Sequence, residues 1–355
     1  MDEIFKEKIA KIAAAAAAAP SGDNSQPWRF VARAPNILEF HAMPEKDNAL
    51  LNVDESGTLI ALGAALQNAE LEAKALGLTP TLRYNDEGSL VAILVLHEEG
   101  SLSDEERRLH EAIPLRHTNR KAYARQPLAG DVRDALLKSV KHDTDVGLSL
   151  IESRGEMKKI SRSLTTMEEI ALSNETLHAL FFADIFWSEA DNLAGKHGLH
   201  IDTLELPPPA KAAFRLLKYW SFTKALSKIG FHKVVAEMNA EQNASASAFG
   251  IITAERLGRR EYVETGRLLE RIWLQATAQG LSMQIVTGVT FLARSIAEPN
   301  TAKLFGVDQL EHVRTAYAVL KECVASSEPV LTFRIGTGGS PTAVSHRRVP
   351  EIIFA

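Results

Sequence analysis

Runs of apolar residues along the chain predict short buried strands separated by helices, which is the pattern of a mixed α+β protein. The strand-like runs are residues 37–41, 91–96, 248–253 and 330–335. Residues 2–19 are rich in alanine, the best helix former, and are predicted to be an amphipathic or buried helix. The acidic residues at its start are wrong for a basic leader, so we do not interpret it as a signal peptide.

Two helical stretches repeat one pattern. Residues 63–78 and 266–281 share Gly, Leu, Ala, Ala, Gly and Leu at identical spacing, and Gly266 follows Gly63 by 203 positions. Each stretch ends at a glycine that suits the left-handed end of a helix. A chance match between two alanine-rich helices is the alternative explanation. The strand-like runs recur in the same order around both helices.

These repeats predict a duplicated α+β unit with halves at residues 1–110 and 111–355, joined through residues 97–104. Such a duplication lets one polypeptide imitate a symmetric dimer. The second half is longer because of a mainly helical insertion at about 155–245. Within it, residues 206–209 (Leu-Pro-Pro-Pro) form a stiff bend that cannot continue a helix.

Composition and charge limit the possible partners. The chain has 355 residues, 45% hydrophobic and 24% charged, which is ordinary for a globular protein. Its net charge of −5 disfavours nucleic acid, and its apolar runs are too short for a membrane span, so we expect a small-molecule partner and no membrane. The single cysteine, Cys323, excludes an intrachain disulfide and fits a cytoplasmic setting. The histidines show no metal-ligand spacing, and His197 and His200 are predicted to lie at the surface.

Four segments carry candidate chemistry. The first is an irregular loop between a helix and a strand, in which short polar side chains could form the rim of a planar heterocycle. An ordinary capped turn is the alternative. Its candidate ligand-binding residues are Pro20, Ser21, Gly22, Asn24 and Gln26, and Trp28 could brace it.

The second segment contains Arg116, Thr118 and Arg120 at alternate positions, so in an extended chain they share one face. Two guanidinium groups with a hydroxyl between them suit a phosphate monoester. A solvated basic segment is the alternative.

The remaining two segments lie near the C-terminus. At Thr287 and Gly288 the backbone could approach a ligand closely, or could simply form a turn. His346, Arg347 and Arg348 could complete an anion site, or could be a solvated tail. The glycines just before them begin no βαβ unit, which excludes a Rossmann fingerprint.

Together these segments resemble the nitroreductase superfamily. Pro20-Ser-x-x-Asn24-Ser-Gln-Pro-Trp28 is similar to that family's flavin-edge loop, and Arg116-x-Thr118-x-Arg120 to its Arg-x-Ser-x-Arg phosphate motif. Gly280–Val289 is similar to the stretch ending Pro-x-Glu-Gly, although Ile285 replaces the proline and Thr287 the glutamate. Arg348 and His346 match basic positions of the phosphate pocket.

The arrangement resembles the Acg-like tandem proteins of this superfamily. The resemblance implies a nitroreductase-like α+β fold, with antiparallel-rich sheets flanked by helices and a tandem duplication that mimics the family's homodimer. The flavin-edge loop occurs only in the first half and the phosphate motif only in the second. The chain is therefore expected to bind one FMN, as a monomer or as a homodimer of tandem chains.

The function that the resemblance implies is an FMN oxidoreductase that passes electrons from NAD(P)H to nitroaromatic or quinone-type acceptors. The flavin carries that chemistry, so no catalytic side chain and no metal are expected. The alternative is a protein that binds or stores FMN under a lid formed by residues 155–245. A third possibility is a scaffold without flavin.

Overall fold

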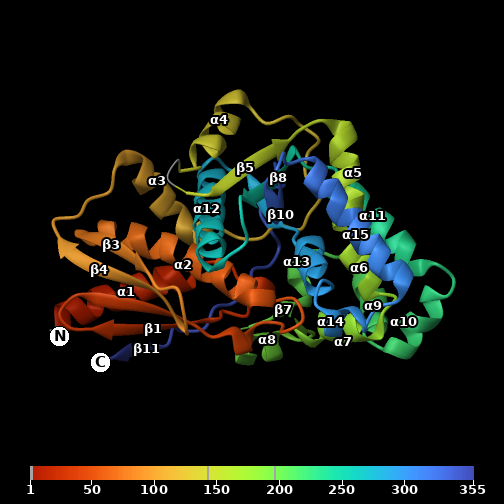
Figure 1. Cartoon of the computed structure of the whole chain (residues 1–355), viewed down its shortest axis with the longest axis horizontal. Helices are drawn as coiled ribbons and strands as arrows, with labels where there is room; N and C mark the ends of the chain where they lie inside the picture. The colour runs from red at the N-terminus through yellow and green to blue at the C-terminus, as the bar shows by residue number, and fades with distance from the viewer. Residues whose placement is uncertain (1–2, 142–143, 196) are drawn as a thin grey trace.

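The computed structural model describes residues 3–141, 144–195 and 197–355. Two main antiparallel sheets lie side by side and helices cover them (Figure 1), which confirms the predicted α+β class with antiparallel-rich sheets. A small third sheet pairs β6 (Ile185–Phe186) with β7 (Leu199–His200). Within the described ranges, no helix is both long enough and apolar enough to cross a bilayer.

The first sheet is built from the N-terminal part of the chain. α2 (Ser56–Ala75) packs on it, and α1 (Glu3–Ala17) packs against α2. α1 buries Ile9, Ile12, Ala13 and Ala16, the spacing of one helix face, which confirms the predicted helix. The strands pair in the order β1-β2-β4-β3. They are β1 (Trp28–Arg33), β2 (Ile37–Ala42), β3 (Leu78–Tyr84) and β4 (Leu90–Glu98).

The second sheet repeats this plan. Its order is β5-β8-β10-β9, so in both sheets the first strand pairs with the second, the second with the fourth and the fourth with the third. A long helix joins the second and third strands in each: α2 in the first and α12 (Arg259–Ala278) in the second. The strands are β5 (Val146–Ile151), β8 (Ala248–Ala254), β9 (Ser282–Ile285) and β10 (Glu328–Gly336).

The two long helices cross at the centre of the molecule (Figure 1). A Cβ atom added to Gly63 would lie 1.9 Å from the Val263 carbonyl oxygen, and one added to Gly266 would lie 1.9 Å from the Ile60 carbonyl oxygen. The two contacts are equivalent, because Val263 and Ile60 each stand three positions before the glycine of their own helix. The repeated glycines therefore allow the helix backbones to touch at the crossing.

Glycines also end both helices as predicted. Gly77 and Gly280 adopt left-handed φ values of +80° and +72° just after α2 and α12. Outside the two main sheets and their long helices, the elements of the two parts of the chain correspond less closely. α3 (Asp104–Ala112) and α4 (Gly130–Lys138) lead from the first sheet to the second.

Helical insertions enlarge the second part. Where β1 and β2 are joined by a short turn, β5 and β8 are separated by helices, so the stretch 155–245 is mainly helical as predicted. The bend at residues 206–209 also occurs, but Pro208 and Pro209 begin a helix there. The helices are α5 (Arg154–Leu164), α6 (Thr166–Ala171), α7 (Glu175–Ala183), α8 (Glu189–Gly195), α9 (Pro208–Leu217), α10 (Trp220–Ser227) and α11 (Phe231–Asn243), and between β9 and β10 α13 (Gly288–Ser295), α14 (Pro299–Ala302) and α15 (Val307–Glu322).

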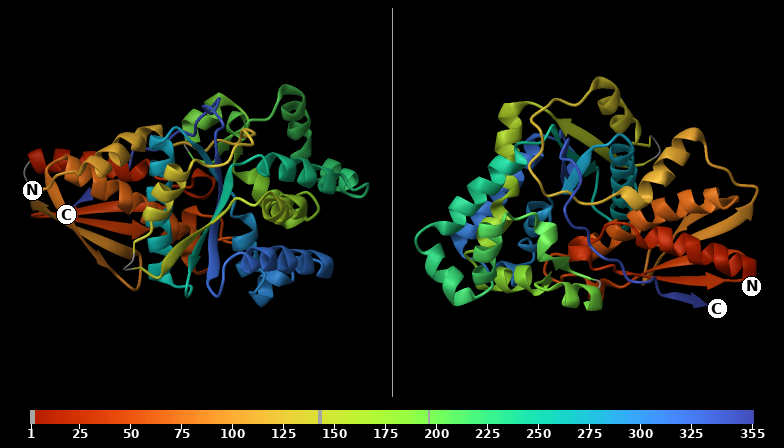
Figure 2. Two further views of the ribbon diagram at one scale, coloured as in Figure 1. Left: turned by 90° about the horizontal axis from the view of Figure 1, so that it is seen from above. Right: turned by 180° about the vertical axis from the view of Figure 1, so that it is seen from behind.

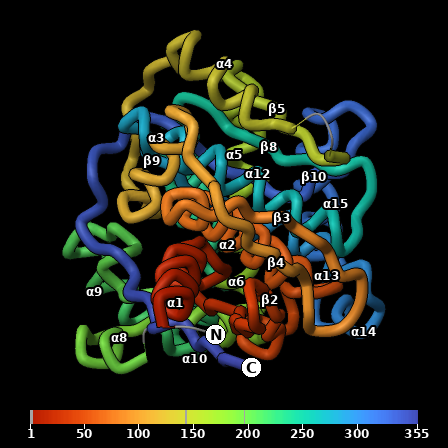
Figure 3. Tube along the Cα trace, turned by 90° about the vertical axis from the view of Figure 1, so that its left-hand side faces the viewer, coloured from red at the N-terminus to blue at the C-terminus, as the bar shows by residue number. Residues whose placement is uncertain are grey.

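The C-terminus returns to the first sheet. β11 (Ile352–Phe354) pairs in parallel with β1, with Ile352 opposite Phe30, and the two chain ends lie close together (Figure 3). One apolar core runs through both sheets and includes Phe30, Trp273 and Phe333. The two parts of the chain thus share a core, and the C-terminal segment ties the second part to the first.

Candidate functional site

The loop after α1 holds an unusual backbone. Asp23, Asn24 and Gln26 all have positive φ values, of 43°, 58° and 55°. Non-glycine residues rarely adopt such values, and the surrounding structure must impose them. Inside the loop, the Gln26 backbone N–H donates to the Ser21 hydroxyl at 3.0 Å. Pro20 is buried and Gly22 is exposed.

Side chains of this loop hold the C-terminal segment. The Asn24 amide donates to the His346 carbonyl at 2.9 Å and accepts a hydrogen bond from Arg347. The Gln26 side-chain oxygen accepts from the Arg348 backbone N–H at 2.8 Å. Two regions more than 300 residues apart in the sequence, each predicted to bind the cofactor, are thus in direct contact.

Arg116 is buried where α1 ends. Its guanidinium donates to the Ala18 carbonyl at 2.8 Å and stacks over the Trp273 ring at 4.5 Å. Its Nε lies 3.2 Å from the Glu270 carboxylate, which is fully buried. Residues of α12 therefore hold Arg116 against the loop of the first part.

Arg347 lies beside Arg116 and Glu270, so this group has two positive charges and one negative charge. Burial, and then the charge of Arg116, lowers the pKa of Arg347 to about 10. Glu270 is the one carboxylate between the two guanidinium groups, and burial raises its pKa. The 3.2 Å contact between Arg116 Nε and Glu270 lacks hydrogen-bond geometry, so in the described part of the chain the buried Nε atoms of Arg116 and Arg347 are both without a hydrogen-bond partner. The group as a whole is positively charged, and its chemistry suits an anion.

The predicted phosphate segment lies between the second sheet and the helical insertion. Thr118 forms a parallel bridge with Met283 of β9, which fixes the segment beside the second sheet. Arg120 donates to the Thr203 carbonyl at 3.0 Å and is the cation nearest to Asp23. Arg347 donates to the Ala19 carbonyl at 3.3 Å, next to the Ala18 carbonyl that Arg116 contacts, whereas the Arg120 guanidinium contacts the helical insertion.

Asp23, between Gly22 and Asn24 in the loop after α1, has a carboxyl group with a shifted pKa. Solvent reaches the residue, but the surrounding chain desolvates its carboxyl and raises the pKa to about 6. The charge of Asp184 raises the pKa further, and Arg120 lowers it.

Thr287 and Gly288 lie at the start of α13. The N–H of Gly288 belongs to the first helical turn and has no partner within the helix. A Cβ atom added to Gly288 would lie 2.5 Å from the Met167 sulfur, so the α6 side chain packs directly on this glycine. Thr287 is half-buried, and its carbonyl accepts from the Thr290 hydroxyl at 2.9 Å.

The insertion also contacts the C-terminal segment. His346 Nε2 lies 3.2 Å from Glu189 of α8, and Arg348 donates to the Gly195 carbonyl at 3.3 Å. With the contacts at Arg120 and Gly288, the insertion reaches the candidate site at four points.

Buried charged groups in α6 and β10 carry no local signal in the sequence. Glu168 of α6 has a carboxyl oxygen that is buried and without a hydrogen-bond partner, and burial raises its pKa to about 7. The charge of Arg334, a fully buried residue of β10, lowers that pKa. Nothing local in the sequence distinguishes Glu168 from a surface glutamate. The prediction for His200 was wrong, since it is buried between the small sheet and α8, and His197 is only partly exposed.

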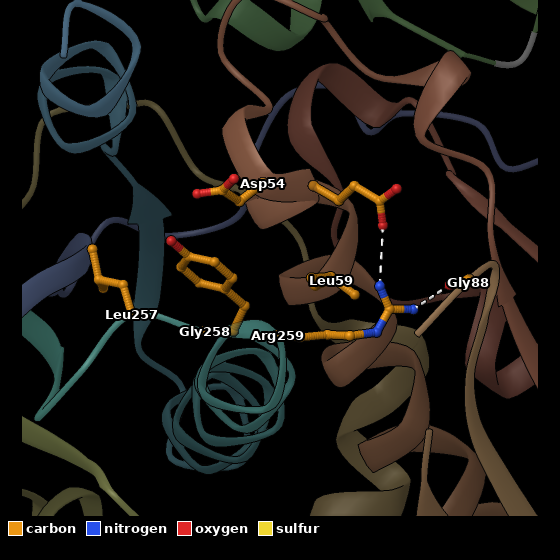
Figure 4. A pocket seen from close by; sticks show the side chains of 8 residues that line it. Asp54, Leu59, Gly88, Leu257, Gly258 and Arg259 are labelled. Atoms are coloured by element: carbon orange, nitrogen blue, oxygen red, sulfur yellow. Dashed lines mark hydrogen bonds and ion pairs between the residues drawn. The ribbon is translucent and has the colours of Figure 1, made fainter. Parts of the chain in front are cut away.

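A separate cavity of about 450 Å³ lies where α2 and α12 begin (Figure 4). Arg259 crosses its wall and is held by the Glu55 carboxylate and the Gly88 carbonyl. None of the predicted cofactor residues lines it. Among the described residues there is no cluster of His, Cys, Asp or Glu that could hold a metal ion.

The chain is similar to known proteins of the nitroreductase superfamily. The model of the Nitroreductase family matches residues 201–319. A stretch of 176 residues is 31% identical to acg of Mycobacterium tuberculosis, whose name describes it as a candidate NAD(P)H nitroreductase, and covers 48% of this chain and 50% of that one. The chain belongs to the nitroreductase superfamily.

Other known proteins match along more of the chain. The protein MT1398 of M. tuberculosis is 24% identical over 346 residues, which are 96% of this chain and 47% of that protein. The chain thus spans about half the length of the curated relatives it matches. A solved structure from Anabaena variabilis, of a candidate nitroreductase, covers 95% of this chain and 89% of its own, with 10% identity and a TM-score of 0.45. The FMN-dependent nitroreductase NfnB of Mycobacterium smegmatis, solved with NADPH, covers 70% and 95%, with 12% identity and a TM-score of 0.38.

Proposed function

We propose that this superfamily member is an FMN-binding oxidoreductase that passes electrons from NAD(P)H to nitroaromatic or quinone-type acceptors. The observation that carries the proposal is the pairing of buried Arg116 with partly buried Arg347 around the buried carboxylate of Glu270. This excess positive charge lies against the Pro20–Trp28 loop, the most specific motif of the sequence. The name of acg, the relative that is 31% identical over half of the chain, supports the same activity.

The residues present fit FMN. Arg116 and Arg347 would hold the phosphate, with Thr118 and Arg348 as further donors, because buried guanidinium groups that lack full compensation favour a dianion. The strained loop from Ser21 to Gln26 would hold the flavin edge. When bound, FMN would supply the electron transfer itself.

The chain's own residues would position and enclose the cofactor. The free N–H of Gly288 at the start of α13 is a donor that can orient a ring nitrogen. Asn24, anchored by Arg347, fixes the loop to the C-terminal segment. Met167 keeps water from the start of α13.

We further propose that the chain is a tandem duplication, with halves 1–110 and 111–355, that binds one FMN. The equal strand order of the two sheets and the equivalent glycine contacts at Gly63 and Gly266 support the duplication. In the first part, Gln67 and Glu70 occupy the positions that Glu270 and Trp273 occupy in the second. Glu70, at the position equivalent to Trp273, forms an ion pair at 2.7 Å with the buried Arg267 of α12, so a structural ion pair occupies this position.

A second candidate function is FMN storage. The four contacts of the insertion with the candidate site favour it, above all Met167 on Gly288, because a covered flavin would not meet a second substrate. Solvent access to the flavin is the property that separates the two functions.

The decisive experiment is an absorbance spectrum of the purified protein, followed by anaerobic addition of NADH or NADPH and then of a quinone. A yellow protein that is bleached and then reoxidised by the quinone is expected. A yellow protein that neither nucleotide bleaches contradicts the reductase and supports storage. A protein that takes up no FMN contradicts both.

Arg347→Gln tests the site itself. Loss of one charge-assisted phosphate contact is expected to weaken FMN binding by about 1.5–3 kcal/mol, measured by flavin fluorescence titration. Arg271→Gln is the matched control, because Arg271 is also a buried arginine whose pKa burial lowers to about 10. It is expected to lose stability but keep its FMN affinity. Equal affinities for all three proteins would place the phosphate elsewhere.

A further inference from the structure

Residues 206–236 form a segment, here called the basic arm, that differs in charge from the rest of the chain. Between Glu205 and Glu237 there is no Asp or Glu, while the protein as a whole has a net charge of −5. The arm comprises α9, α10 and the start of α11. Its cations are Lys211, Arg215, Lys218, Lys224, Lys228 and Lys233.

Most of these cations are free. Lys211 is paired with Asp202, but Lys218, Lys224, Lys228 and Lys233 are exposed and have no carboxylate within 4.0 Å in the described part of the chain. Their charges therefore face solvent without local compensation.

The arm also exposes large apolar side chains. Ile229 is 80% exposed, the largest value in the arm. Phe222 lies in α10 and Ile229 in the turn that follows it, and Lys224 and Lys228 stand between them in the sequence. The ring of Tyr219 has the Lys218 ammonium 4.9 Å from its centre. The exposed apolar residues are Leu216, Tyr219, Phe222, Ile229 and Val234.

The exposure of these apolar residues does not come from a missing hydrophobic core in this region. The arm has its own buried cluster, which includes Phe182, Ile185 and Leu217, with Phe214 and Leu226 packed on it. The helices α10 and α11 project at the end of the molecule opposite to both chain ends (Figures 1 and 2). The apolar and basic side chains thus lie on a supported, prominent surface.

We infer that the basic arm docks on the surface of an anionic phospholipid bilayer. Lysines beside exposed Phe, Tyr, Leu and Ile side chains are typical of helices that lie in the interface of such a bilayer, where headgroups take the charges and acyl chains the apolar groups. A nucleic acid would satisfy the lysines but leave Phe222 and Ile229 in water. The inference revises the expectation, drawn from net charge and span length, that a membrane is not a partner. It does not depend on the proposed flavin chemistry.

The test is co-sedimentation of the full chain with vesicles of phosphatidylcholine containing about a third phosphatidylserine, and with phosphatidylcholine alone. Binding is expected only to the anionic vesicles and is expected to weaken with salt. Lys224→Gln with Lys228→Gln should weaken binding about 25-fold, since each lysine near an anionic surface contributes about fivefold. Ile229→Ser should weaken it as well.

Matched controls lie outside the arm. Lys138→Gln with Lys303→Gln removes two exposed lysines, and Val307→Ser removes a side chain that is 82% exposed. Both are expected to bind like the unchanged protein, and a thermal melt confirms that every variant folds. No binding to anionic vesicles, or equal weakening by the control variants, overturns the inference. Binding to duplex DNA that Ile229→Ser leaves unchanged, without binding to vesicles, overturns it too.

Discussion

Gly63→Ala is the substitution that most directly tests the central helix crossing. The new methyl carbon would lie 1.9 Å from the Val263 carbonyl oxygen and 3.0 Å from the Arg267 backbone nitrogen. Side-chain Cβ atoms essentially never approach other atoms closer than 3.0 Å, so α2 and α12 must separate by about 1 Å at this point. The contact is between two backbones, so rotation of a side chain cannot relieve it.

The cost follows from that separation. A gap of this size forfeits about a quarter to a half of the dispersion energy of the atoms it parts, and overpacked cores typically lose about 1–3 kcal/mol. Alanine gains about 1 kcal/mol over glycine as a helix former, which offsets part of the loss. Because both helices lie in the main core, we expect a net loss at the upper end, about 2 kcal/mol. In a chain of this length that corresponds to a fall of about 3 °C in Tm.

Urea denaturation followed by circular dichroism measures the effect. Gly155→Ala is the matched control, because Gly155 lies in the first turn of α5 with no atom within 4 Å of an added Cβ. It is expected to be neutral or stabilising. Gly266→Ala, at the equivalent contact, should match Gly63→Ala, and the double variant should cost less than the sum because one separation serves both. A Gly63→Ala protein as stable as the unchanged one would refute the close crossing.

Three further predictions concern the candidate site. Met167→Ala uncovers the start of α13 and should raise the rate of flavin reduction by NADPH without changing FMN affinity. The control Met157→Ala, at a buried position in α5, should only lower stability. Equal rates of flavin reduction in Met167→Ala and the unchanged protein would contradict a covering role for Met167. Arg116→Gln removes the buried guanidinium whose Nε lies 3.2 Å from the Glu270 carboxylate, and should cost about 3–5 kcal/mol in urea denaturation; Glu270→Gln in the same chain should recover much of it. Because burial raises the pKa of Glu168 from 4.5 to about 7, its contribution to stability is present below pH 4.5 and is lost as pH rises through 7. Glu168→Gln should therefore be more stable than the unchanged protein by about 3 kcal/mol at pH 8 and equal to it below pH 4.5. A difference independent of pH would show that the residue does not titrate in this way.

Much of the framework was predictable because it depends on local pattern. The strands at residues 37–41, 91–96, 248–253 and 330–335 were visible as short apolar runs, and the structure has β2, β4, β8 and β10 there. The repeat of Gly63 and Gly266 was visible as spacing alone. Its meaning, that two backbones touch, required the crossing itself.

The pairing of groups within the site was decided by the tertiary structure. The sequence placed Arg116 and Arg120 as one phosphate clamp because they alternate, but Arg347, 231 positions later, is the neighbour of Arg116. The C-terminal segment returns to the first sheet through β11, and no local pattern encodes such a return.

Which side chains are buried and which are exposed also depends partly on the sequence pattern and partly on the tertiary packing. The charge pattern of the basic arm is visible in the sequence. Only the packing of α9 and α10 shows that apolar side chains of these helices remain exposed to solvent. Glu168 is ordinary in the sequence and acquires its raised pKa from the chain that surrounds it. The sequence by itself determined the elements and the motifs, because helix and strand periods and turn residues act over a few positions. The three-dimensional packing determined which charges are desolvated and which meet, because solvation depends on every segment that comes near.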